Sequence, residues 1–139
     1  MGVKSDNLIE QKSYDFAVRI INLYKHLKST HKEAILSKQI LRSGTSIGAN
    51  VCEATRAQSK NDFIAKINIA LKESYETDYW LRLLSDTDFI TKEEFKSIYS
   101  DCQDVSNILA KILITSKNPQ SSQESTLKDV FMNYEAYNL

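Results

Sequence analysis

Apolar residues recur every three or four positions along four stretches of the chain, with polar residues between them. This period is that of an amphipathic helix, which buries one stripe and exposes the rest. It predicts helices over roughly residues 6–29, 32–57 and 92–116, and a further helix from a cap at Ser59 to about Ser85. The expected buried stripes are Ile9, Phe16, Ile20, Leu23 and Leu27; Leu36, Ile40, Ser43, Ile47, Val51 and Ala54; Phe63, Ile67, Ala70, Ser74, Leu81 and Leu84; and Phe95, Ile98, Cys102, Val105, Leu109 and Ile112.

Two helix starts carry capping signals. Ser59 is followed three residues later by Asp62, and Thr91 is followed by Glu94, which are a weaker and a preferred form of the capping box. The links between the helices are short, so consecutive helices should be antiparallel neighbours. The chain has only three glycines and one proline, which leaves little of the turn chemistry that hairpins need. We expect an all-α protein, an antiparallel up-down-up-down four-helix bundle over residues 1–116.

The character of the sequence changes over residues 117–139. This part begins with a polar stretch that contains the single proline, Pro119, and predicts a linker. Apolar residues then resume helical spacing at Leu127, Val130, Phe131, Tyr134 and Tyr137. The tail is therefore either frayed or a short docking helix that lies against its own bundle or a neighbouring copy.

The second predicted helix contains residues that helices usually avoid. Two glycines and three hydroxyl residues fall within about two turns of residues 39–53, and each glycine costs a helix interior about 0.8–1 kcal/mol relative to alanine. Gly44, Gly48 and Cys52 are spaced four residues apart, which clears a groove where another helix backbone can approach closely. We interpret this pattern as a groove for a partner helix, and it favours assembly over catalysis.

The net charge is zero, but the charge is unevenly distributed. Residues 1–72 carry 12 Lys and Arg against 6 Asp and Glu, and residues 73–139 carry 6 against 12. Two solvated helix faces of opposite sign would explain this. So would a head-to-tail contact between copies, which closes into a ring if the rotation permits.

Patterns of catalytic and metal-binding residues are missing from the sequence. Neither His26 nor His31 follows a glutamate by three residues, as a di-iron bundle would require, and Cys52 and Cys102 have no CxxC partner. No nucleophile elbow or glycine-rich phosphate loop is present. We expect no metal, no cofactor and no small-molecule substrate.

An acidic set lies on the third predicted helix, at Glu73, Glu76 and Asp78. Paired carboxylates can serve as a general acid and base when one pKa is raised. We favour a structural role instead, in which Glu73 and Glu76 accept hydrogen bonds from Arg42, Arg56 or hydroxyls of the second helix. Tyr79 or Trp80 would then supply a packing anchor.

No apolar run approaches the roughly 20 residues that cross a bilayer, and the N-terminus lacks the apolar core of a signal peptide. The two cysteines also show no disulfide pattern, and together these features favour a location in the cytoplasm. Basic residues cluster around the first two links and are candidate nucleic-acid contacts. They are Lys25, Lys28, Lys32 and Lys38 around the first link, and Arg56, Lys60 and Lys66 around the second. A lysine-rich solvated bundle end explains them equally well.

Two segments carry a family signature. Residues 39–54, QILRSGTSIGANVCEA, contain Gln-x-x-Arg-Ser-x-x-Ser-Ile-x-x-Asn-x-x-Glu, formed by Gln39, Arg42, Ser43, Ser46, Ile47, Asn50 and Glu53. Residues 57–84 add Phe63, Lys72, Glu73, Glu76, Thr77, Tyr79, Trp80 and Leu81. Over about residues 10–115 the chain resembles the four-helix-bundle family named for 23S rRNA intervening sequences.

The resemblance implies a small bacterial bundle that assembles as a homopentameric ring, in a family to which no catalytic activity is attributed. Some members are encoded inside insertions within 23S rRNA genes. A related branch, the accessory variability proteins of diversity-generating retroelements, forms basic pentamers that bind nucleic acid and a reverse transcriptase. This chain differs from that branch in being neutral, which argues against strong non-specific RNA binding.

We therefore expect a non-enzymatic, cytoplasmic homo-oligomer, most readily a pentamer, that acts as an RNA- or ribonucleoprotein-associated scaffold. The alternative is a protein–protein adaptor that binds no nucleic acid. The residues expected to hold the second helix against the third, or to shape the contact between subunits, are Gln39, Arg42, Ser43, Gly44, Ser46, Gly48, Asn50, Glu53, Glu73, Glu76 and Trp80.

Overall fold

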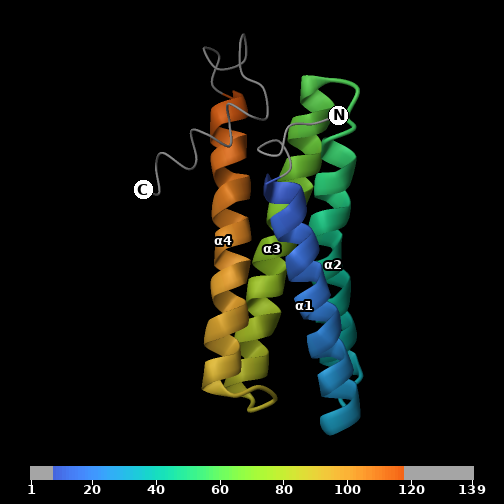
Figure 1. The fold of residues 1–139 in the computed structure, drawn as a ribbon, viewed down its shortest axis with the longest axis vertical. Coiled ribbons are helices and arrows are strands. Elements are labelled where there is room, and N and C mark those ends of the chain that lie inside the picture. Colours follow the sequence, from blue (N-terminus) through green and yellow to red (C-terminus); the bar gives the residue numbers. More distant parts are fainter. Residues whose placement is uncertain (1–7, 118–139) are drawn as a thin grey trace.

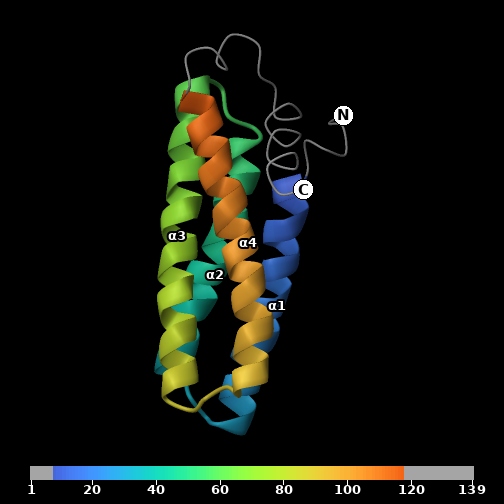
Figure 2. The same cartoon turned by 90° about the vertical axis from the view of Figure 1, so that its left-hand side faces the viewer.

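The computed structural model describes residues 8–117, which form four helices in one antiparallel bundle. They are α1 (Leu8–Thr30), α2 (Ile35–Ala54), α3 (Lys60–Asp86) and α4 (Lys92–Lys117). The α1–α2 and α3–α4 links lie at one end of the bundle, and the α2–α3 link lies at the other (Figures 1 and 2). The predicted all-α, up-down-up-down four-helix bundle is confirmed. The predicted linker and tail fall almost wholly on residues 118–139, outside the described residues.

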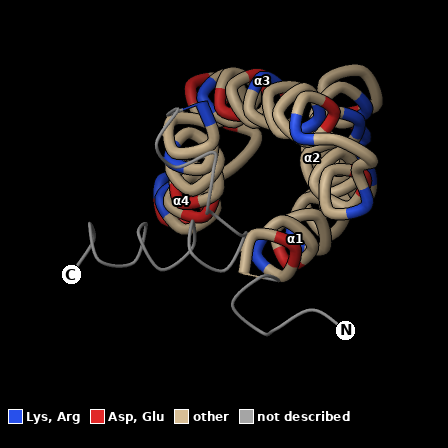
Figure 3. Tube along the Cα trace, turned by 90° about the horizontal axis from the view of Figure 1, so that it is seen from above, with Lys and Arg blue, Asp and Glu red and all other residues tan. Residues whose placement is uncertain are grey.

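Seen along its axis, the bundle has its helices in chain order around the core, each beside the next, with α4 beside α1 (Figure 3). The predicted apolar stripes meet in this core, where Phe16, Ile20 and Leu27 are almost completely buried. Four predicted core residues at the edges of the stripes are only half-buried, namely Leu23, Leu36, Phe63 and Phe95. The core also buries hydroxyl residues that the apolar pattern did not include, among them Ser13, Ser37, Thr77 and Ser106.

Both predicted capping signals are confirmed. The backbone N–H of Asp62 donates to Ser59 Oγ at 3.0 Å. At the start of α4, the N–H of Glu94 donates to Thr91 Oγ1 at 3.1 Å, and the N–H of Thr91 donates to Glu94 Oε1 at 2.8 Å. These are the reciprocal bonds of a capping box. They also lower the pKa of the Glu94 carboxyl, chiefly through the Thr91 N–H.

The predicted bounds of the second helix are wrong at both ends, because α2 begins at Ile35 and ends at Ala54. Lys32 has φ of 52°, a left-handed conformation that separates α2 from α1. The Glu33 carboxylate then accepts from the first N–H groups of α2, at 3.2, 2.9 and 2.7 Å from Ile35, Leu36 and Ser37. Burial raises the pKa of Glu33, but these three hydrogen bonds outweigh burial and the pKa is lowered.

Candidate interaction surface on helices α2 and α3

The glycines of α2 face α1 of the same chain. A Cβ added at Gly44 would lie 2.7 Å from Ile20 Cγ1, and one added at Gly48 would lie 3.3 Å from the carbonyl oxygen of Ser13. The predicted close approach of a helix is thus confirmed, but the helix is α1 and not a partner's. The third position of the pattern, Cys52, is exposed. These glycines therefore pack two helices of one subunit, and the assembly inferred from them stays a prediction.

Arg42 joins α2 to α3 through two carboxylates. Its Nη1 lies 3.2 and 3.3 Å from the two carboxylate oxygens of Glu73, and its Nη2 lies 2.5 Å from Glu76 Oε2. Trp80 Nε1 donates to the same Glu76 oxygen at 3.0 Å. Glu73 and Glu76 thus accept from Arg42, one of the expected donors. Trp80 joins them through its N–H, one turn further along α3.

The charges of this array are mutually stabilised. Hydrogen bonds from Arg42, and then from Trp80, lower the pKa of Glu76. The pKa of Arg42 is raised by its bonds to Glu76 and then to Glu73. A general acid needs a raised carboxyl pKa, and the direction at Glu76 is the opposite. The array therefore fits an ion-pair network and not an acid–base pair.

A buried layer of hydroxyls lies beneath the array. Thr77 Oγ1 lies 2.9 Å from Ser43 Oγ and 2.8 Å from the Glu73 carbonyl oxygen. One turn away, Ser106 Oγ of α4 lies 2.8 Å from Ser74 Oγ. Thr77 was missed as a buried position, although it appears in the family signature and lies at the helical step between the predicted core positions Ser74 and Leu81. Hydroxyls were already accepted in the stripes at Ser43 and Ser74, so its spacing could have revealed it.

The remaining motif residues of α2 have mixed roles. Ser46 Oγ donates to the Arg42 carbonyl oxygen at 2.7 Å, and Asn50 Nδ2 donates to the Ser46 carbonyl oxygen at 2.8 Å. These bonds lie within α2 and do not bridge to α3. Glu53 does bridge, because its carboxylate lies 2.8 Å from Lys66 Nζ of α3. The remaining motif residue of α2, Gln39, is exposed.

Two exposed side chains of α3 lie beside the array. Ile69, 42% exposed, is four residues before Glu73 and so lies on the same side of the helix. Tyr79, 48% exposed, meets the Trp80 ring edge to face, with centroids 5.1 Å apart. Tyr75 is 55% exposed but lies two residues from Glu73, on another side of α3. The name α2–α3 face is used below for Arg42, Ile69, Glu73, Glu76, Tyr79 and Trp80.

The candidate nucleic-acid residues divide between the two ends of the bundle. Arg56 Nη1 donates to the Cys52 carbonyl oxygen at 3.2 Å, and Lys66 pairs with Glu53, both near the α2–α3 link, where Lys60 begins α3. The other cluster lies around the α1–α2 link and comprises Lys25, Lys28, Lys32 and Lys38. The α3–α4 link lies at that same end, and acidic residues outnumber basic ones in and beside it, with Asp86, Asp88, Glu93 and Glu94 against Lys92. Every helix carries both signs of charge (Figure 3).

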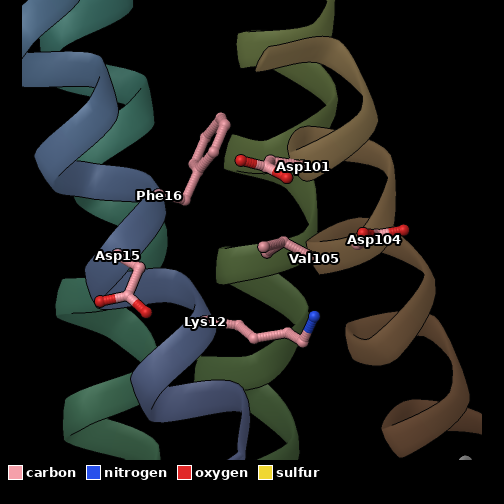
Figure 4. A pocket seen from close by; sticks show the side chains of 6 residues that line it. All are labelled: Lys12, Asp15, Phe16, Asp101, Asp104 and Val105. Atoms are coloured by element: carbon pink, nitrogen blue, oxygen red, sulfur yellow. The ribbon is translucent and has the colours of Figure 1, made fainter. Parts of the chain in front are cut away.

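Two shallow hollows lie along the seam between α1 and α4, with volumes of about 180 and 260 Å³. Between them Arg19 crosses the seam, with Nη1 at 2.6 Å from Asp101 Oδ2 and Nη2 at 3.0 Å from Ser97 Oγ. In the smaller hollow, Asp101 faces Phe16 of α1, whereas Asp104 points away from α1 (Figure 4). The carboxylates lining it therefore do not converge on one point.

Within residues 8–117, no three His, Cys, Asp or Glu side chains gather as a metal site would require. None of the four described helices combines the length and hydropathy needed to span a bilayer. Burial raises the pKa of the Cys102 thiol to about 12, while Cys52 lies on the surface. The cytoplasmic location inferred from the sequence stays a prediction.

Comparison with known proteins identifies a family and a similar solved structure. Residues 5–111 match the model of a family described as 23S rRNA-intervening sequence protein. The chain is also similar to a solved structure from Bacteroides thetaiotaomicron, described as a protein with unknown function from the S23 ribosomal protein family. The two share 56% sequence identity with a TM-score of 0.76, over 76% of this chain and 98% of that chain. No curated protein matches the chain.

Proposed function

Because the chain belongs to the 23S rRNA-intervening sequence protein family, we propose that it is a non-enzymatic scaffold that acts by assembly, first with copies of itself. The proposal rests on the α2–α3 face. Arg, Trp and Tyr are the residue types that most often dominate binding energy at protein interfaces. Here Arg42, Trp80 and Tyr79 lie together, and Arg42 and Trp80 are already held in place through Glu76.

Pre-organisation is the physical reason that this face suits an interface. Fixing a free side chain at an interface costs about 0.5–1.5 kcal/mol. Arg42 is restrained by two carboxylates before any partner arrives, so less of that cost remains. Exposed Tyr79 supplies apolar area with few rotatable bonds. The assembly we propose is a homo-oligomer, with a pentamer as the expected form from the family resemblance.

Light scattering coupled to size-exclusion chromatography tests the proposal. The expected mass is close to five times 15.9 kDa. The double variant Ile69→Ser with Tyr79→Ser should lower the mass at a given concentration. Ile114→Ser on α4 is the control, since Ile114 is an exposed apolar residue, at 67%, that lies outside the α2–α3 face. A wild-type species of 15.9 kDa would overturn the proposal.

Association with RNA is the second candidate, supported by the family's description and by the lysines around the α1–α2 link. These lysines face a single end of the bundle, but the acidic α3–α4 link shares that end and weakens its positive field. Lys28 also stacks over Tyr24, with Nζ 5.5 Å from the ring centroid. We therefore expect weak, salt-sensitive binding to structured rRNA fragments in a gel shift, reduced by Lys25→Gln with Lys28→Gln. With no shift at low salt, the adaptor function alone would stand.

A further inference from the structure

The outer face between α1 and α2 is apolar in a chain with 26% charged residues. A hollow of about 280 Å³ lies between the two helices, with Tyr14 and Ala17 on α1 and Glu10 at its end near the start of α1. The α2 side is built from small residues, namely Thr45, Gly48, Ala49 and Cys52. We call the hollow and its apolar rim the α1–α2 face. It lies on the other side of α2 from the α2–α3 face.

Exposed apolar side chains extend this face along α1. Tyr14 is 67% exposed, Val18 is 43% exposed and Ile21 is 38% exposed. Steps of four and three residues place all three on one side of the helix. A contiguous apolar patch beside a groove of small residues is the surface that an amphipathic helix recognises.

We propose that residues 127–137 of the same chain dock on the α1–α2 face as an amphipathic helix. In this segment Leu127, Val130, Phe131 and Tyr134 share one side at helical spacing. A helix of this segment would be about 16 Å long, and the run from Leu41 to Cys52 on α2 rises by about the same length. The apolar side of the segment thus matches the face in character and extent.

The connection is long enough to reach. The tail leaves α4 at Lys117, at the end of the bundle where α1 begins and α2 ends (Figures 1 and 2). Residues 118–126 can span up to about 30 Å when extended, which covers the distance around one end of a small bundle. A tether of this length also gives the tail a high effective concentration at its own face.

Charge favours this side of the bundle. Residues 8–57, which include α1 and α2, carry eight Lys and Arg against four Asp and Glu. Residues 60–117 carry eight against ten, and the tail from residue 118 carries one against three. An acidic tail is attracted to the α1–α2 half and repelled by the α3–α4 half. The α1–α4 seam is a poorer site, because Asp15, Asp101 and Asp104 line it and Arg19 already crosses it.

Disulfide trapping in the full-length chain tests the docking, because exposed Cys52 lines the hollow whereas Cys102 is buried. Val130→Cys places a thiol on the apolar side of the tail helix. Ala136→Cys is the matched control, since it places a thiol on the opposite side with a similarly small change. We expect Val130→Cys to form an intramolecular bond with Cys52 at least tenfold faster than Ala136→Cys under the same mild oxidant. Peptide mapping identifies the bond.

A second variant tests the surface itself. Adding Val18→Asp to Val130→Cys should slow trapping to the rate of the Ala136→Cys control, whereas adding Ile114→Asp on α4, at an exposed apolar residue outside both named faces, should leave the rate unchanged. Far-UV circular dichroism confirms that each variant folds. Equal trapping rates for Val130→Cys and Ala136→Cys would overturn the docking. Disulfide-linked dimers would overturn docking within one chain and assign the segment to a neighbouring copy. Neither result depends on whether the α2–α3 face mediates assembly.

Discussion

Replacing Gly44 by alanine should destabilise the bundle, although alanine is the better helix former. A Cβ at this position would lie 2.7 and 2.8 Å from Ile20 Cγ1 and Cγ2 and 3.2 Å from Ile20 Cβ. Ile20 is completely buried and branched at Cβ, so its side chain has no open space to rotate into. Overpacking of a core costs about 1–3 kcal/mol, and the gain in helix propensity returns about 1 kcal/mol. Because Ile20 cannot rotate away, the cost falls in the upper part of that range, about 2–3 kcal/mol, and we expect a net loss of about 1–2 kcal/mol.

Gly48→Ala is the matched control, one turn further along the same helix. Its Cβ would meet the Ser13 carbonyl oxygen at 3.3 Å, which requires a shift of only a few tenths of an ångström. The gain in helix propensity offsets most of that cost, so we expect a change within about 0.5 kcal/mol of the original. Urea unfolding followed by circular dichroism, at one protein concentration, measures both variants.

A double-mutant cycle isolates the contact itself. Ile20→Ala removes both γ carbons and should cost about 2–5 kcal/mol alone. In that background Gly44→Ala should be neutral or stabilising, which corresponds to a coupling of about 1–3 kcal/mol. If Gly44→Ala is as stable as the original chain, or if its penalty is unchanged beside Ile20→Ala, then α1 does not press on α2 as described.

Three further predictions concern single side chains. Glu33→Gln should cost about 1 kcal/mol at neutral pH, because the carboxylate caps α2. The pKa of Glu33 is lowered in the folded chain. The stability that its carboxylate contributes is therefore present above the unfolded pKa of about 4.3 and is lost as the pH falls through the folded pKa. The difference in stability between the variant and the original chain should shrink in acid. Thr77→Val should cost about 1–2 kcal/mol in urea unfolding and Thr77→Ser less, since only serine keeps the buried bond to Ser43. A soluble maleimide should label Cys52 within minutes and Cys102 only after unfolding, because Cys102 is buried and its thiol pKa is raised. Fast labelling of both cysteines would contradict the packing of α4.

Local chemistry made much of the fold predictable from the sequence. The capping signals at Ser59 and Thr91 fixed two helix starts, because each needs only residues three positions apart. The ends of α2 were misplaced because helical periodicity continues past them. The true start depends on the left-handed Lys32 and on Glu33, a glutamate that caps from before the helix.

The candidate site was predictable where opposite charges had few partners to choose from. Arg42 could reach Glu73 and Glu76 once α2 and α3 were known to be neighbours. The glycine pattern, in contrast, does not identify the helix that packs against it. A small residue indicates that some backbone comes close, but α1 of the same chain and a helix of another subunit produce the same pattern at Gly44 and Gly48. Only the structure distinguishes the two.

The two flanks of α2 thus have different physical roles. Toward α1, glycines set how closely two backbones pack, and the expected effect on stability is large at Gly44, where the neighbouring Ile20 is buried. Toward α3, Arg42 is half exposed, and ion pairs at such positions usually contribute only about 0–1 kcal/mol. Stability alone is therefore a weak reason for the Arg42 array. The array contributes little to folding, yet fixes an arginine and a tryptophan beside exposed Tyr79, and this is why we propose an interface there.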